Sequence, residues 1–175
     1  MKAPLNASAP DTMDDVGLRI RPLDPSDRAP LLALIRETGV FNEEEIAIAL
    51  ELIDIVLGQP AQRDYVIRVC EEHGNVTGYY CIGPTPATVG TFDLYWIAVD
   101  PALHGRGIGS QLMRHAEEYV RGARGRLIIL ETSSRPLYEP TRRFYASNGY
   151  TQLARIAGYY RPDDDLVVFG KYVSQ

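Results

Sequence analysis

Two kinds of hydrophobic pattern divide the chain into predicted strands and helices. Runs in which apolar, aromatic and β-branched residues are continuous, or alternate with polar ones, predict β-strands. The clearest run is FDLYWIAV, which predicts a buried central strand and ends at Asp100 and Pro101, because proline has no N–H to give to a central ladder. The predicted strands are Leu18–Leu23, Tyr65–Cys70, Val76–Ile82, Phe92–Val99, Arg126–Thr132, Thr151–Tyr160 and Leu166–Val173.

Apolar residues at helical spacing predict four helices between these strands. Ser26 or Asp27 can cap the first helix, which ends at Gly39. Asn42 followed by Glu45 predicts a capping box at the start of the second. The other two helices are predicted over Ile108–Arg121 and Thr141–Asn148.

The order of these elements predicts a mixed α/β (α+β) fold. The strand Phe92–Val99, the helix after it and the strand Arg126–Thr132 form a β–α–β unit, so these two strands should be parallel with a right-handed crossover. The last two strands should be antiparallel, because only a short turn joins them. With 175 residues the chain is long enough for one substantial core. We therefore expect a single domain over residues 16–175, after a disordered, polar tail over residues 1–15.

Three glycines at alternate positions follow the central strand. Gly105 and Gly107 lie between that strand and the helix Ile108–Arg121, and Gly109 is in the first turn of that helix. Backbone N–H groups in such a turn and in the first helical turn lack internal partners, and the helix dipole adds positive potential. Glycine also lets the backbone come close to a phosphate without a Cβ in the way. This stretch therefore predicts a site for a phosphate-bearing cofactor.

The spacing of these glycines argues against a dinucleotide cofactor. A Rossmann site needs G-x-G-x-x-G directly after the strand and an acidic residue about 20 positions later. Glu131 could supply the acid, but the third glycine falls at Ser110 when counted from Gly105 and at Leu112 when counted from Gly107. The spacing therefore makes NAD an unsuitable cofactor.

The stretch HGRGIG, from His104 to Gly109, resembles the pyrophosphate loop of the GNAT superfamily, the acetyl-CoA-dependent N-acetyltransferases. The signature of that family is Gln or Arg, two residues, Gly, one residue, then Gly or Ala. His104 departs from it at the first position. The resemblance covers Leu18–Val173 and extends downstream through Arg126–Thr132 and into the short helix with Phe144 and Tyr145.

The resemblance implies both a fold and a cofactor. It implies a GNAT-like, mostly antiparallel central sheet with flanking helices, in which the two parallel strands splay apart around acetyl-CoA, the acetyl donor. The pantetheine arm would bond to the backbone of Ile97, Ala98 and Val99. The pyrophosphate would bond to backbone amides of Gly105, Arg106, Gly107, Ile108, Gly109 and Ser110.

The resemblance also implies two catalytic side chains. Tyr145 matches the tyrosine of the family's short helix and would act as the general acid on the CoA sulfur, since a phenol with a pKa near 10 is protonated at neutral pH. Glu131 would be the base that takes a proton from the amine. Asp93 and Tyr95, on the central strand, are rivals for that role, as is water. The alternative interpretations are a core tyrosine and a structural glutamate.

The acceptor side is implied to lie along the first two helices and the loop before the short helix. Phe41 and Glu43–Glu45 could face the acceptor, or belong to a core stripe and a solvated cap. In Thr132–Glu139, the hydroxyls and Tyr138 could hold a polar substrate, or could only form hydrogen bonds within the loop itself.

Charge and composition limit the remaining functions. His104–Arg143 carries eight arginines and four glutamates in a chain of net charge −5. A local basic surface suits a small polyanion such as the CoA phosphates and argues against nucleic-acid binding, which usually needs a basic domain. No apolar run is long enough to cross a membrane, and Met1–Asp15 lacks the apolar core of a secretory signal, which favours a cytoplasmic protein.

Cysteine and histidine usage predicts neither a disulfide framework nor a metal. Cys70 and Cys81 are the two cysteines of the chain and are expected to be buried free thiols. The three histidines are scattered, without the spacing of a metal site.

The sequence therefore predicts an enzyme that moves the acetyl group of acetyl-CoA to a primary amine. The acceptor, a small molecule or a protein, is left open, and so is a homodimer. The alternative is a non-catalytic acetyl-CoA sensor or an interaction module on the same fold. The presence of Tyr145 argues against that alternative.

Overall fold

The computed structural model describes residues 12–13 and 17–173. These residues form an eight-stranded sheet of order β1-β2-β3-β4-β5-β6-β8-β7, in which each neighbouring pair is antiparallel except β5 and β6. The strands are β1 (Thr12–Met13), β2 (Leu18–Pro22), β3 (Val66–Glu72), β4 (Asn75–Pro84), β5 (Thr91–Val99), β6 (Leu127–Ser133), β7 (Thr151–Arg161) and β8 (Asp164–Tyr172).

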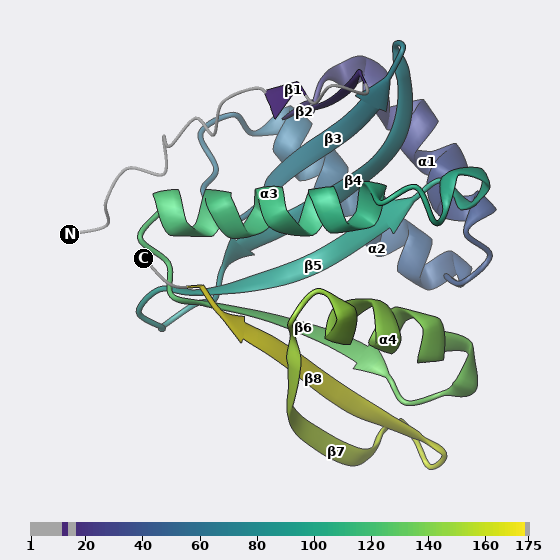
Figure 1. Ribbon diagram of the computed structural model, residues 1–175, viewed down its shortest axis with the longest axis vertical. Helices are drawn as coiled ribbons and strands as arrows, with labels where there is room; N and C mark the ends of the chain where they lie inside the picture. The colour runs from purple at the N-terminus through teal and green to yellow at the C-terminus, as the bar shows by residue number, and fades with distance from the viewer. Residues whose placement is uncertain (1–11, 14–16, 174–175) are drawn as a thin grey trace.

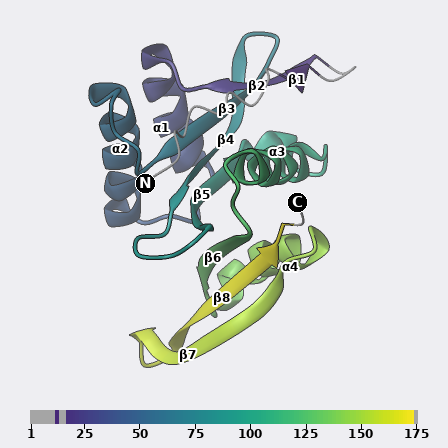
Figure 2. The ribbon, with the colours of Figure 1, turned by 90° about the vertical axis from the view of Figure 1, so that its left-hand side faces the viewer.

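Helices cover both faces of this sheet (Figures 1 and 2). They are α1 (Arg28–Glu37), α2 (Glu43–Gly58), α3 (Ile108–Gly122) and α4 (Glu139–Ser147), with single turns of 3-10 helix η1 (Pro25–Asp27), η2 (Pro101–Leu103) and η3 (Pro136–Tyr138). α3 and α4 lie on one face, where Leu112 and Met113 belong to a buried cluster with Ile128. α1 and α2 lie on the other face, over a second cluster around Ile53 and Tyr79.

The predicted fold class is confirmed, including the parallel pair between β5 and β6. The predicted capping box of α2 also forms: Asn42 Oδ1 accepts from the Glu45 amide at 2.9 Å, and Glu45 Oε2 accepts from the Asn42 amide at 2.8 Å. The short helix α4 begins at Glu139, two residues before the predicted start, with Pro140 in its first turn. Proline fits there because its missing N–H would have no helical partner.

The structure describes two residues of the expected tail. Thr12 and Met13 form β1 and pair with Ile20 and Arg19 of β2, whereas disorder was predicted through residue 15. Polar composition does not prevent this pairing, because an edge strand offers free backbone groups to any segment beside it. The rest of the predicted tail, residues 1–11 and 14–15, lies outside the described residues.

None of the described helices is long and apolar enough to cross a membrane.

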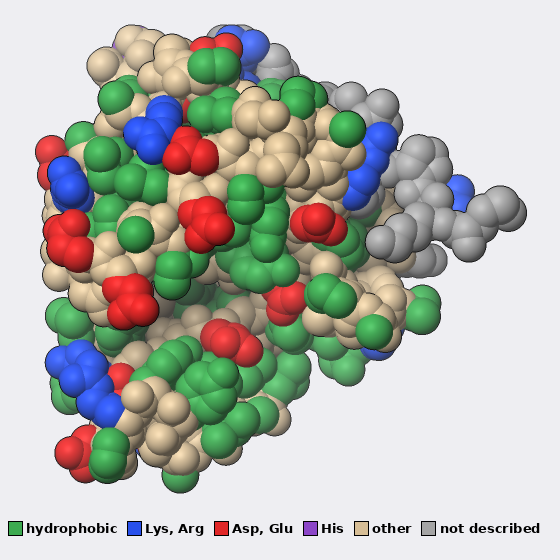
Figure 3. Space-filling view, turned by 180° about the vertical axis from the view of Figure 1, so that it is seen from behind, with side chains coloured by type: hydrophobic (Ala, Val, Ile, Leu, Met, Phe, Trp, Pro, Cys, Tyr) green, Lys and Arg blue, Asp and Glu red, His purple; other side chains and the backbone are tan. Residues whose placement is uncertain are grey.

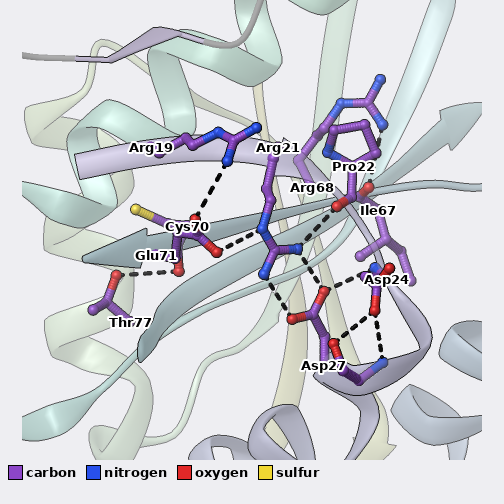
Figure 4. Close-up of polar contacts among 11 residues, drawn as sticks. Arg19, Arg21, Pro22, Asp24, Asp27, Ile67, Arg68, Cys70, Glu71 and Thr77 are labelled. Atoms are coloured by element: carbon purple, nitrogen blue, oxygen red, sulfur yellow. Dashed lines mark hydrogen bonds and ion pairs between the residues drawn. The ribbon is translucent and has the colours of Figure 1, made fainter. Parts of the chain in front are cut away.

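A network of charged side chains ties the start of α1 to the sheet (Figure 4). The Arg21 guanidinium of β2 bonds to both carboxylate oxygens of Asp27, at 2.7 and 2.8 Å, and its Nε donates to Glu71 of β3 at 2.6 Å. Asp27 also accepts from the backbone amide of Asp24 at 2.8 Å. Asp27 is 3% exposed, so its charge depends on these partners rather than on water.

We expect Asp27→Asn to lower the free energy of unfolding by about 2 kcal/mol, because Arg21 loses a buried charged partner. Arg28 and Asp54 supply a matched control, since they form a similar two-bond ion pair at 2.6 and 2.8 Å with side chains 45% and 49% exposed. Asp54→Asn should change the stability by less than about 0.5 kcal/mol. Urea unfolding of both variants measures the difference, and equal losses would contradict it.

Candidate active site

The parallel strands β5 and β6 are paired only at one end. Backbone pairing joins Thr91, Phe92 and Asp93 to Leu127, Ile128 and Ile129. Beyond this point β5 remains paired with β4, and β6 remains paired with β8. The facing edges of β5 and β6 therefore diverge, and this leaves backbone donors and acceptors available between them.

The β5 backbone is also irregular beside this opening. Ile82 of β4 pairs with Leu94, and Cys81 pairs with Trp96, so Tyr95 is an extra residue in β5. Such a bulge leaves one residue out of the ladder and turns the strand. In a regular strand Leu94 and Trp96 would point to the same face. Because of the bulge, Leu94 and Ile97 belong to the α3 face, whereas Trp96 belongs to the α1–α2 face.

The glycine-rich loop follows β5 and leads directly into α3. Gly105 and Gly107 both have a φ of +82°, a conformation that favours glycine, and a Cβ on either would meet no atom within 4 Å. The first amides of α3 have no carbonyl partner inside the helix by its geometry. The loop is therefore open and lies at the positive end of the helix dipole, so its residues fit a pyrophosphate; the Arg106 amide already donates to the Leu103 carbonyl at 3.4 Å.

His104, the departure from the family signature, binds the protein backbone. Its Nε2 lies 3.1 Å from the carbonyl oxygen of Val99, so Nε2 carries the proton and donates. Asp100 Oδ1 accepts from the amide of Ala102 at 2.8 Å and starts η2. These two bonds connect the end of β5 to the loop, so the His104 side chain shapes the chain between Val99 and Gly105.

The helix α4 lies against the start of α3. A Cβ on Gly109 would stand 3.0 Å from the Phe144 ring, so this glycine allows the two helices to approach closely. Tyr145, the next residue, packs with its ring centroid 5.9 Å from that of Phe169 and is 7% exposed. The structure therefore brings Tyr145 into the α3–α4 face of the sheet, beside the glycine-rich loop.

Burial controls the ionisation of Tyr145. Loss of hydration raises the pKa of its phenol above the ordinary value, so the hydroxyl is protonated throughout the neutral range. No side-chain hydrogen bond joins this hydroxyl to another described residue. It can therefore donate to a group that enters the site.

Glu131 lies on the opposite face of the sheet from Tyr145. Ile128 and Leu130 of β6 face the α3 side, so alternation along the strand directs Glu131 to the α1–α2 side. Asp93 pairs with Ile129 and shares that face. Partial burial, with the nearby charge of Asp93, raises the pKa of the Glu131 carboxyl above its usual value. A raised pKa suits a group that accepts a proton near neutral pH.

The α1–α2 face is hollowed, and acidic side chains surround the hollow (Figure 3). The Tyr138 hydroxyl lies 3.5 Å from Glu45 Oε1 and donates to the Val40 carbonyl at 3.4 Å, so η3 meets the start of α2 across this face. Tyr160 lies near Glu131. Burial, followed by the charge of Glu131, raises the pKa of its phenol to about 12.

Aromatic rings complete this surface. Phe41 and Trp96 pack edge to face with centroids 4.9 Å apart, and Tyr65 and Tyr95 do so at 5.3 Å. The sequence offers Phe41 as an acceptor-side residue only through the family resemblance. Its contact with Trp96 has no sequence signal, because the two residues come from different elements and meet only in the fold.

Comparison with known proteins agrees with this geometry. The family model described as an acetyltransferase (GNAT) domain matches residues 63–152. A GNAT-family protein from Desulfovibrio desulfuricans is 37% identical to this chain over 90% of its length, with 99% of that protein covered and a TM-score of 0.85. No curated protein is similar enough in sequence to be matched. The chain belongs to the GNAT family and is an acetyltransferase by class.

More distant structures share the fold. Ard1 from Thermoplasma volcanium is 21% identical over 91% of this chain and all of its own, with a TM-score of 0.73. A protein from Salmonella typhimurium, whose structure contains its cofactor acetyl-CoA, is 21% identical over 91% of this chain and 95% of its own, with a TM-score of 0.67. An aminoglycoside 6'-N-acetyltransferase in complex with coenzyme A is 17% identical over 89% of this chain and 97% of its own, with a TM-score of 0.71.

One contact of the loop has no signal in the sequence. The Arg106 guanidinium bonds to both carboxylate oxygens of Glu72, at 2.9 and 2.6 Å. Glu72 ends β3 and lies far from the loop in sequence. No local pattern distinguishes it from the glutamate beside it, so only the fold reveals the pair.

Proposed function

We propose that this protein transfers the acetyl group of acetyl-CoA to a primary amine by direct attack, with Tyr145 as general acid and Glu131 as base. The observation that carries the proposal is the opening between β5 and β6. The glycine-rich loop follows the end of β5, and Tyr145 and Glu131 are on opposite faces of the sheet. A thioester held between the strands would meet the acid from one side and the amine from the other.

The loop would hold the cofactor through its backbone. The amides of Gly105, Arg106 and Gly107, followed by those of Ile108, Gly109 and Ser110, would bind the pyrophosphate at the N-terminus of α3. The β5 backbone over Ile97, Ala98 and Val99 would bind the pantetheine arm. The Val99 carbonyl already accepts from His104, so the arm would use the other free groups of this edge first.

The reaction balances with these groups. Glu131 takes a proton from the ammonium form of the acceptor, directly or through water, and leaves a neutral amine. The amine attacks the thioester carbonyl carbon, so that a C–N bond forms and the C–S bond breaks, and the nitrogen loses its second proton to solvent. Tyr145 gives its proton to the departing thiolate. The products are an amide and CoA; Glu131 then releases its proton to solvent, and Tyr145 regains one from solvent.

The acidic hollow supports an amine acceptor. Asp93 and Glu131 lie close together and attract a cation, and the ring of Tyr95 near Asp93 offers a face that favours ammonium groups. A panel of primary amines, small molecules and peptides, offered with acetyl-CoA, tests the proposal. The expected result is CoA release that depends on the acceptor, with one acetyl group added to the amine by mass spectrometry.

A non-catalytic sensor would give a different result. It would bind acetyl-CoA in calorimetry and release no CoA with any member of the panel. If acetyl-CoA does not bind the purified protein at all, both interpretations are wrong.

We expect Glu131→Gln to lower kcat about a hundredfold at neutral pH, with acetyl-CoA affinity nearly unchanged. Only the carboxylate form of Glu131 can accept a proton, so the wild-type rate should fall as pH decreases through the raised pKa of this group. The loss in the variant should shrink at high pH, where the amine is already neutral.

Asp93→Asn is the matched control, because it removes a neighbouring charge from the same face. This change should lower the pKa of Glu131 and shift the acidic limb of the pH profile to lower pH, with a small effect on kcat. A large loss in Asp93→Asn together with full activity in Glu131→Gln would assign the base to Asp93. Full activity in both variants would leave water as the base.

A further inference from the structure

The glycine-rich loop is tied to β3 by one two-bond ion pair. Arg106 Nη1 lies 2.9 Å from Glu72 Oε2, and Arg106 Nη2 lies 2.6 Å from Glu72 Oε1. This parallel arrangement is the strongest geometry available to an arginine and a carboxylate. The Glu72 side chain is 13% exposed and the Arg106 side chain is 42% exposed. The carboxylate is therefore the less exposed partner, and the guanidinium reaches it from the loop.

The end of β3 is a rigid anchor for this contact. Glu71, the residue before Glu72, accepts from Arg21 Nε at 2.6 Å, and Arg21 is in turn held by Asp27 (Figure 4). The register between β3 and β4 shifts between Cys70 and Glu71. The two consecutive glutamates therefore bind different partners: Glu71 holds the start of α1, and Glu72 holds the loop.

The loop needs such an anchor because of its own composition. Glycines flank Arg106 on both sides, each with a φ of +82° and open space around it. Glycine loses more backbone entropy on ordering than any other residue. If the loop were untethered, it would become ordered only when the cofactor binds, and this entropy cost would lower the affinity for the cofactor. A second problem is electrostatic, since an unpaired carboxylate near a pyrophosphate site would repel it. The pair with Arg106 meets both needs.

We propose that Glu72 is a positioning residue for the pyrophosphate site, which acts through the side chain of Arg106. The inference rests on the proposed function, in which the backbone of this loop binds CoA. Arg106 serves in it as a brace that orders the loop before the cofactor arrives, and its guanidinium remains on Glu72. A direct phosphate ligand would behave differently, because Glu72 would then compete with the phosphate for the same guanidinium.

The two roles predict opposite effects for one substitution. If Glu72 positions the loop, Glu72→Gln should raise the Kd for CoA about three- to tenfold, and Arg106→Gln should raise it by a similar factor. The size is modest because the pair is partly exposed. The double variant should be no weaker than either single variant, since both remove the same contact. If Arg106 were a phosphate ligand held back by Glu72, Glu72→Gln would tighten CoA binding instead.

A donor without the pyrophosphate separates this role from a general loss of structure. S-acetylpantetheine lacks the group that the loop binds, so Glu72→Gln should leave its KM unchanged while raising the KM for acetyl-CoA. The kcat with acetyl-CoA should stay within about twofold of wild type, because the reacting groups are elsewhere. Asp54→Asn, which breaks the similar ion pair with Arg28 on α1 and α2, should leave the Kd for CoA unchanged.

The decisive measurements are calorimetric Kd values for CoA with wild type, both single variants and the double variant. Coupled losses, with S-acetylpantetheine unaffected, support the proposal. Tighter binding by Glu72→Gln, unchanged affinity, or additive losses in the double variant would overturn it while leaving the acetyltransferase function in place. A wild-type protein that does not bind CoA would overturn this inference together with the proposed function.

Discussion

Tyr145→Phe should lower kcat for acetyl transfer by roughly 10²- to 10⁴-fold, the usual contribution of a positioned general acid. The substitution removes one hydroxyl and almost no volume, so the packing against Phe144 and Phe169 should be retained. The departing thiolate would then have no protein donor. Acetyl-CoA affinity should change by at most about 1 kcal/mol, the value of one neutral hydrogen bond.

The experiment is single-turnover acetyl transfer with an acceptor from the amine panel, with cofactor affinity measured on the same preparations. Tyr150→Phe is the matched control, because Tyr150 is a second tyrosine of the same buried cluster and is 2% exposed. That variant should keep kcat within about twofold of wild type. Full-rate transfer by Tyr145→Phe would remove this hydroxyl from the mechanism.

The same comparison separates an enzyme from a sensor. A sensor has no turnover to lose, so Tyr145→Phe would change only the affinity for acetyl-CoA, and only slightly. An enzyme shows the large rate loss with the small affinity change. A loss in Tyr150→Phe as large as that in Tyr145→Phe would instead indicate disturbed packing of the α3–α4 face.

Gly107→Glu should abolish acetyl-CoA binding while the protein remains folded. A carboxylate and its stem would fill the space beside the loop, where a Cβ now meets no atom within 4 Å, and would repel the pyrophosphate. The φ of +82° adds strain of about 1–2 kcal/mol for any residue with a Cβ, which a domain of this size should tolerate. Calorimetry measures the binding, and thermal unfolding checks the fold.

Gly39→Glu is the control for strain alone. Gly39 has a φ of +64°, and a Cβ there would also meet no atom within 4 Å, but it follows α1, which lies on the other face of the sheet from α3. This variant should lose similar stability and bind acetyl-CoA normally. Unchanged affinity in a folded Gly107→Glu protein would mean that the cofactor does not use this loop.

Several features of the fold follow from short stretches of sequence. The strands form where apolar and β-branched residues are continuous or alternate, and α2 begins where Asn42 and Glu45 bond to each other's amides. The glycine-rich loop is equally local, because φ values near +80° are inexpensive only for glycine. The order strand, helix, strand also predicts the parallel pair of β5 and β6, through the handedness of the crossover.

The chemistry of the site depends on contacts between distant parts of the chain. The pairing of β5 with β6 stops after Asp93, since β4 and β8 hold these two strands on their outer sides. This divergence, and the placement of Tyr145 and Glu131 on opposite faces of the sheet, have no signal in either strand alone. The family resemblance suggested these two residues, and the fold shows which face each one occupies.

The sequence by itself determined the elements, the capping box and the loop, because each depends on the backbone preferences of neighbouring residues. Only the tertiary structure decided that Glu72 rather than Glu71 meets Arg106, and that His104 bonds to the Val99 carbonyl. Both glutamates have the same charge and nearly the same local surroundings. The register between β3 and β4 shifts between Cys70 and Glu71, and beyond this shift Glu71 and Glu72 bind different partners. Side-chain partners are chosen by position in space, and that position exists only once the sheet has formed.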